Sequence, residues 1–156
     1  MYDKCVNILK SLKTEYLPAN SNNNEDMVFF LQMIGDYTRY MIECCPENEL
    51  ENRKKETLDA YMLALKHADH LDKYHIIRPG LVLNLSAFYY EVLNNRNDAL
   101  RVSLDILSIW SKRGLEANTR TNRTLSLLNE NVIFWQEEEK KEFEETSTGG
   151  CTDSDR

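Results

Sequence analysis

The sequence has little of what builds tight turns, membrane spans or basic surfaces. Its 156 residues include three prolines and five glycines, and no apolar run approaches the roughly 20 residues that a membrane-spanning helix needs. The formal net charge is -7, with 29% charged residues, which disfavours a sequence-independent grip on nucleic acid or anionic lipid. We therefore expect one soluble domain, in which a local basic site holds any anionic ligand.

Cysteine is scarce and follows no metal or redox pattern. The chain has Cys5, Cys44, Cys45 and Cys151; the adjacent pair points to different sides of a helix, and no CxxC occurs. Residues 1–17 mix charged with apolar residues and contain neither an apolar secretion core nor a cleavage site. We expect reduced thiols and a cytoplasmic protein, with the nucleus as a second compartment.

Motifs for catalysis are also missing. The sequence has no Gly-rich phosphate loop, GxSxG or HExxH, and no Ser/His/Asp or Cys/His set stands out. His67, His70 and His75, with Asp69 and Asp72 nearby, are the candidate metal ligands of an alternative, a small metal-dependent hydrolase. Because no paired ligand motif occurs elsewhere, we expect these residues to form a hydrated polar helix end and not a metal site. The sequence thus predicts no enzyme, no cofactor and no metal.

Apolar residues recur every three or four positions almost throughout, which predicts an all-α fold. Short loops make neighbouring helices antiparallel, so we expect helical hairpins that form a concave groove. Asn24 is the expected N-cap of the second helix. The helical domain covers residues 1–138, and the charged segment 139–156 is predicted to be a disordered acidic tail. The helices are expected over about 2–16, 24–45, 49–70, 79–93, 98–112 and 122–138.

Two predicted helices carry an asparagine on an apolar face. Asn84 interrupts such a face in the helix over 79–93, and Leu127, Asn131 and Trp135 lie at i, i+4 and i+8 in the last helix. The plainer interpretation is that Asn84 bonds within the fold and that the apolar residues are core. In the alternative, the two amides line a groove and hold the backbone of an extended peptide.

The string GDYTRY places Arg39 and Tyr40 in the second predicted helix. A surface ion pair of Arg39 with Glu43, four residues later, is the plainer interpretation and is worth only about 0.3–0.5 kcal/mol. Alternatively, the guanidinium and the phenol hydroxyl bind a phosphate, for which the planar Arg fork is well suited.

Three strings in order, GDYTRY, GLVLNLSAFYYEVLN and LLNENVIFW, resemble the 14-3-3 family over residues 26–135. The resemblance implies a cup-shaped helical adaptor that binds phosphoserine or phosphothreonine segments of client proteins. It implies that Arg39 and Tyr40 bind the phosphate, and that Asn84 and Asn131 hold the peptide main chain. The groove-lining positions that it implies are Leu81, Leu83, Glu91, Leu127 and Trp135.

The sequence also departs from the family pattern. Family members are longer on the N-terminal side, where they carry the dimerising helices and a Lys and a second Arg of the phosphate pocket. Without those two cations we expect binding to be weaker by about 3–6 kcal/mol, or about 10²- to 10⁴-fold, and the oligomeric state stays open. The alternative is a scaffold similar to tetratricopeptide arrays that binds unmodified peptides.

Overall fold

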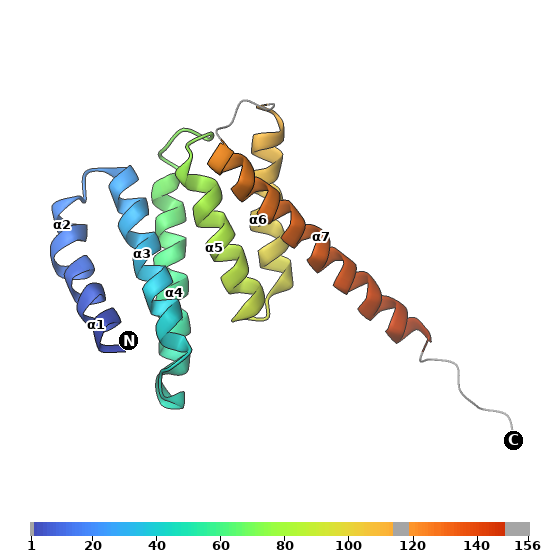
Figure 1. Cartoon of the computed structure of the whole chain (residues 1–156), viewed down its shortest axis with the longest axis horizontal. Helices are drawn as coiled ribbons and strands as arrows, with labels where there is room; N and C mark the ends of the chain where they lie inside the picture. Colours follow the sequence, from blue (N-terminus) through green and yellow to red (C-terminus); the bar gives the residue numbers. More distant parts are fainter. Residues whose placement is uncertain (1, 114–118, 149–156) are drawn as a thin grey trace, which may run out of the picture.

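The computed structural model describes residues 2–113 and 119–148, where every regular element is helical (Figure 1). The all-α prediction is confirmed. None of the helices in these two ranges is long and apolar enough to cross a membrane. The elements are α1 (Tyr2–Ser11), a π-helical turn η1 (Leu12–Tyr16), α2 (Leu17–Ala19), α3 (Asn24–Ile42), α4 (Glu47–Ala68), α5 (Ile77–Glu91), α6 (Arg96–Ser111) and α7 (Thr119–Thr148).

The helices alternate in direction, as short connections require. In Figure 1, α3, α5 and α7 begin at the same end of the molecule, and α4 and α6 return between them. Helix α5 contacts α3, α4, α6 and α7, and its Leu81, Leu85 and Phe88 are fully buried. This central helix therefore fixes where α3 and α7 lie. These three helices carry the residues of the candidate functional site.

The start of α3 differs from the prediction by one residue. Asn23, and not Asn24, is the N-cap, and its side-chain oxygen accepts from the N–H groups of Glu25 and Asp26 at 3.0 and 3.3 Å. Asn24 instead contacts Nδ1 of His67 in α4 at 2.9 Å. Neighbouring asparagines are equally good caps, so this contact between helices, which the local sequence does not reveal, decides between them.

The first helical segment runs past Pro18 instead of ending before it. The N–H of Leu17 donates to the carbonyl of Leu12, five residues back, which makes η1 a π-helical turn. Proline lacks an N–H, and its ring crowds the carbonyl of the preceding turn. The wider π turn relieves this crowding, and the chain continues helically into α2.

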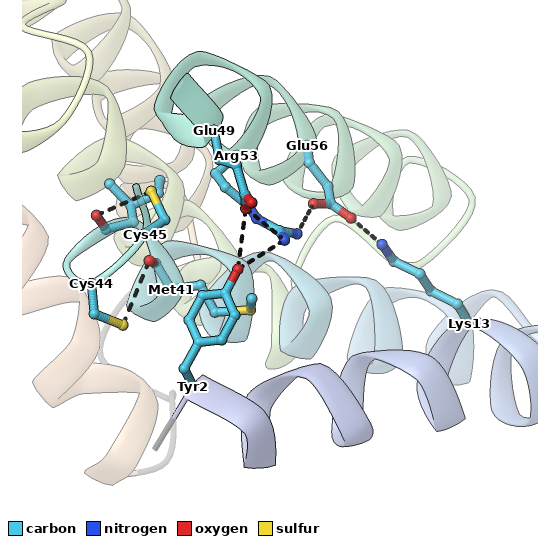
Figure 2. Close-up of polar contacts among 9 residues, drawn as sticks. Tyr2, Lys13, Met41, Cys44, Cys45, Glu49, Arg53 and Glu56 are labelled. Atoms are coloured by element: carbon cyan, nitrogen blue, oxygen red, sulfur yellow. Dashed lines mark hydrogen bonds and ion pairs between the residues drawn. The ribbon is translucent and has the colours of Figure 1, made fainter. Parts of the chain in front are cut away.

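A polar network fastens α1 and η1 to α4 (Figure 2). Tyr2 Oη donates to Glu49 at 3.1 Å and accepts from Arg53 at 3.2 Å. Glu56 pairs with Lys13 and accepts from Arg53 at 3.0 Å. Burial opposes ionisation of Glu56, but Lys13 and Arg53 outweigh it and hold the pKa of this carboxyl below its usual value.

Helix α7 continues beyond the predicted boundary. It is helical through residue 148, ten residues past the predicted end of the helical domain at 138, and 149–156 lie outside the described residues. In Figure 1 this second half of α7 extends past the rest of the molecule. Arg96 of α6 donates to Glu142 at 2.6 and 3.0 Å. This pair joins helices that are distant in sequence, which apolar periodicity does not signal.

Candidate functional site

Arg39 lies near the end of α3 and pairs with a residue of another helix. Its Nη2 is 2.5 Å from Oε2 of Glu91, the last residue of α5 and 52 residues away in sequence. The predicted plain pair with Glu43 is therefore wrong. The Arg39 side chain is 26% exposed and that of Glu91 is 56% exposed. The cation is thus partly sheltered, whereas its carboxylate partner borders on solvent.

Tyr40 follows Arg39 on α3 and is 55% exposed. Its ring meets that of Tyr37 edge to face, with centroids 6.3 Å apart. Among the described residues its hydroxyl has no hydrogen-bond partner, so this hydroxyl can act as donor or acceptor towards a ligand.

Asp36, one turn before Arg39, is a residue that the sequence analysis missed. Its Oδ1 accepts from Tyr61 Oη of α4 at 2.6 Å and from Asn84 Nδ2 of α5 at 3.0 Å. Burial raises the pKa of Asp36 above its usual value, against the two hydrogen bonds and the charge of Arg39. Burial and the charge of Asp36 also raise the pKa of Tyr61, so Tyr61 stays a protonated donor.

The contact with Asp36 fixes the direction of the Asn84 amide. Because Nδ2 donates to Asp36, the side-chain oxygen must point to the other side of the amide. Asn84 thus bonds to a neighbouring helix, in line with the plainer interpretation, and its side-chain oxygen accepts no hydrogen bond among the described residues. Asp36 stands in the string GDYTRY, but its hydrogen-bond donors lie on α4 and α5, so the local sequence does not reveal its role.

Two of the predicted groove-lining residues are part of the core. Leu81 is fully buried, and Trp135 of α7 is 3% exposed because it stacks on Tyr90 of α5, with centroids 5.0 Å apart and an interplanar angle of 25°. Neither side chain presents surface to a ligand in this arrangement, so a role of Leu81 and Trp135 in lining the groove stays a prediction. They hold α5 and α7 together below the surface.

The other predicted residues are accessible. Leu83 of α5 and Asn131 of α7 are half-buried, and Leu127 of α7 is 44% exposed. Asn131 makes no side-chain hydrogen bond within the part of the chain that the structure describes. Its amide is therefore available to a ligand, as is the apolar surface of Leu127.

The surface along α5 is hollowed near both ends of this helix. One hollow of about 420 Å³ lies where α3, α5 and α7 begin, and its lining includes Phe29, Asp36, Gly80, Arg120 and Thr124. A second hollow of about 380 Å³ is lined by Tyr90, Glu91, Asn94, Arg96, Glu138 and Glu142. Asp36 lines the first hollow and Glu91 the second, and Arg39, one helical turn after Asp36, pairs with Glu91.

The histidines connect elements beside the first hollow. His67 contacts Asn24 as described, and His75 accepts from the N–H of Ile77 at 3.3 Å through Nδ1. The other ring nitrogen of His75 is 3.5 Å from Glu25 of α3. The described ranges contain no group of three or more His, Cys, Asp or Glu side chains arranged to hold a metal ion.

These features define a helical binding module. A partly sheltered cation on α3, two amides on α5 and α7, and accessible apolar side chains on α5 and α7 lie on helices that contact one another in an all-α fold.

Comparison with known proteins then identifies the family. The family model for 14-3-3 protein matches residues 1–136. The chain is 38% identical over 144 residues to a 14-3-3-like protein of Fucus vesiculosus (85% of this chain, 55% of the relative). It is 34% identical over 152 residues to the 14-3-3-like protein GF14 phi of Arabidopsis thaliana (92% and 57%). The chain belongs to the 14-3-3 family, whose members are non-enzymatic adaptor proteins. It spans a little over half the length of these curated relatives.

Proposed function

We propose that this chain is an adaptor that binds phosphoserine or phosphothreonine segments of client proteins as extended peptides across α3, α5 and α7. The observation that carries the proposal is the Arg39 guanidinium, which is partly sheltered and holds the carboxylate of Glu91 at 2.5 Å. A site that holds one anionic oxygen group is suited to another, and the Arg fork matches phosphate geometry.

The surrounding residues supply the remaining roles. The exposed Tyr40 hydroxyl donates a hydrogen bond to the phosphate. Asn84, oriented by Asp36, and Asn131 hold the peptide main chain from opposite sides. Leu127, 44% exposed on α7, and the half-buried Leu83 on α5 contact peptide side chains.

The strength of the phosphate preference follows from Arg39. One charge-assisted interaction contributes about 1.5–3 kcal/mol, which is about 10- to 150-fold in affinity. We therefore expect a phosphoserine peptide to bind at least about tenfold more tightly than its unphosphorylated twin. Removing the guanidinium removes the group that distinguishes the two peptides.

The test is a calorimetric titration of wild type and of Arg39→Ala with each of the two peptides. Wild type is expected to prefer the phosphopeptide, and Arg39→Ala to bind the twins equally. Arg101→Ala is the matched control, since it removes the same charge from an exposed arginine of α6 that pairs with Asp98. Equal affinities of wild type for the two peptides would sink the proposal.

The alternative function is a scaffold that binds unmodified peptides, with Arg39 as a structural residue. The observation that favours it is that Arg39 already has a partner, Glu91. Binding of the unphosphorylated twin that is insensitive to salt and to Arg39→Ala supports this alternative, because a phosphate contact weakens as salt screens it.

We also propose the cytoplasm as the compartment. Cys5, Cys44 and Cys45 are free thiols, and a reducing compartment keeps thiols in this state. Cys151 lies outside the described residues. The negative net charge of -7 favours client proteins over nucleic acid or anionic membranes as partners.

A further inference from the structure

Glu91 occupies the position in which a ligand anion has to bind. Its Oε2 is 2.5 Å from Nη2 of Arg39, so the two groups form a charge-assisted hydrogen bond. A phosphate that accepts from the same N–H must therefore first displace the carboxylate. The two residues belong to different helices, α3 and α5, so the pair is a tertiary contact and not a local helix feature.

The two partners differ in how firmly they are held. Arg39 is 26% exposed and is also attracted by Asp36, which itself accepts hydrogen bonds from Tyr61 and Asn84. Glu91 is 56% exposed, terminates α5 and lines the second hollow. The cation thus stays in place when the pair opens, and the Glu91 side chain is the part that moves into solvent.

Other carboxylates beside Glu91 are engaged elsewhere. In the same hollow, Glu138 accepts from Tyr90, and Glu142 accepts from Arg96 at 2.6 Å. Because Glu91 belongs to the same chain as Arg39, it competes with a ligand for this guanidinium at an effective concentration of about millimolar. Such a competitor lowers the apparent affinity of every ligand that needs Arg39.

We propose that Glu91 is an intramolecular competitor for Arg39 and thereby sets the affinity of the groove for phosphopeptides. The proposal rests on the proposed function, because it concerns the same guanidinium. A ligand that does not use Arg39 is unaffected, whereas a phosphate displaces Glu91 because it brings about 1.5–2 negative charges and three acceptor oxygens.

Glu91→Gln tests the proposal because glutamine keeps the size of the side chain and removes its charge. We expect this variant to bind a phosphoserine peptide about two- to fivefold more tightly than wild type, which corresponds to about 0.4–1 kcal/mol. Affinity for the unphosphorylated twin is expected to stay the same. Glu51→Gln is the matched control, because it changes the net charge equally on α4, where Glu51 pairs with Lys54 at 2.9 Å.

A double-mutant cycle separates competition from general repulsion. In an Arg39→Ala background, Glu91→Gln is expected to have no effect on phosphopeptide affinity, since nothing is left to compete for. A gain that persists without Arg39, or that Glu51→Gln reproduces, overturns the proposal.

The outcome also distinguishes this inference from the proposed function. If wild type prefers the phosphopeptide through Arg39 but Glu91→Gln leaves its affinity unchanged, the competitor role is wrong and the adaptor function stands. If neither wild type nor Glu91→Gln prefers the phosphopeptide, both are wrong. Thermal unfolding of each variant confirms that the proteins compared are folded.

Discussion

Gly35 allows α3 and α4 to approach closely, and its replacement by alanine tests the arrangement that supports the site. A Cβ at Gly35 would lie 2.5 Å from Cε1 and 2.7 Å from Cδ1 of Tyr61. Ordinary carbon contacts are about 3.5–4.0 Å, so the overlap is about 1 Å. Tyr61 is fully buried and bonded to Asp36 at 2.6 Å, so its ring cannot move aside without breaking that bond.

The expected loss of stability follows from opposing terms. Overpacking of a buried contact costs about 1–3 kcal/mol, and loss of the hydrogen bond to Asp36 adds about 1 kcal/mol. Alanine stabilises a helix interior by about 0.8–1.0 kcal/mol relative to glycine. We therefore expect Gly35→Ala to lower the free energy of unfolding by about 1–3 kcal/mol, measured by urea unfolding with circular dichroism.

Gly80→Ala is the matched control for this experiment. It makes the same chemical change inside α5, where, apart from the adjacent residues and the backbone of the helix itself, no heavy atom of the described chain comes within 4 Å of the added Cβ. We expect Gly80→Ala to raise the free energy of unfolding by up to about 1 kcal/mol. If Gly35→Ala is as stable as wild type, or gains stability as Gly80→Ala does, the steric argument is refuted.

Two predictions concern pH, and their signs are opposite. The pKa of Glu56 is lowered in the fold, so its stabilising contribution is present above its unfolded value and is lost as pH falls through the folded value. Glu56→Gln is expected to be less stable than wild type by about 0.5–1 kcal/mol near neutral pH, and urea midpoints should converge on acidification; a constant gap contradicts this. The pKa of Asp36 is raised, so its contribution is present below its unfolded value and is lost as pH rises. The midpoint of Asp36→Asn should therefore rise relative to wild type between about pH 4 and neutral pH, and a parallel pH dependence of the two proteins argues against a buried, ionising Asp36.

The periodicity of the sequence predicted the fold because helix formation is largely a local property. Apolar spacing located each helix, whereas ends that depend on contacts between helices were misplaced. The cap at Asn23, the π turn before Pro18 and the extension of α7 belong to this group. At the start of α3 and in the second half of α7, the deciding contact joins residues of different helices. Before Pro18, the deciding feature is a local change of the backbone to a π turn.

The candidate site was predictable in residue type but not in pairing. Helical spacing selected Glu43 as the partner of Arg39, because it lies four residues away, whereas the fold provides Glu91 from 52 residues away. Periodicity also placed Leu81 and Trp135 on an apolar face without showing that this face meets other helices. Their burial depends on how α7 crosses α5, and no local pattern encodes that crossing.

The two carboxylates beside Arg39 explain how a site for an anion tolerates negative neighbours. Asp36 is held by hydrogen bonds from Tyr61 and Asn84, so it stays in place when a ligand arrives and keeps the Asn84 amide in one orientation. Among the described residues Glu91 has one ion-pair partner, Arg39 at 2.5 Å, and its side chain is 56% exposed, so it regains hydration as soon as it leaves. Moving an exposed carboxylate costs about 1 kcal/mol or less, whereas stripping a buried one of its hydrogen bonds costs more. At the proposed phosphate site, burial, and not charge, is therefore expected to determine which of the two carboxylates a phosphate displaces.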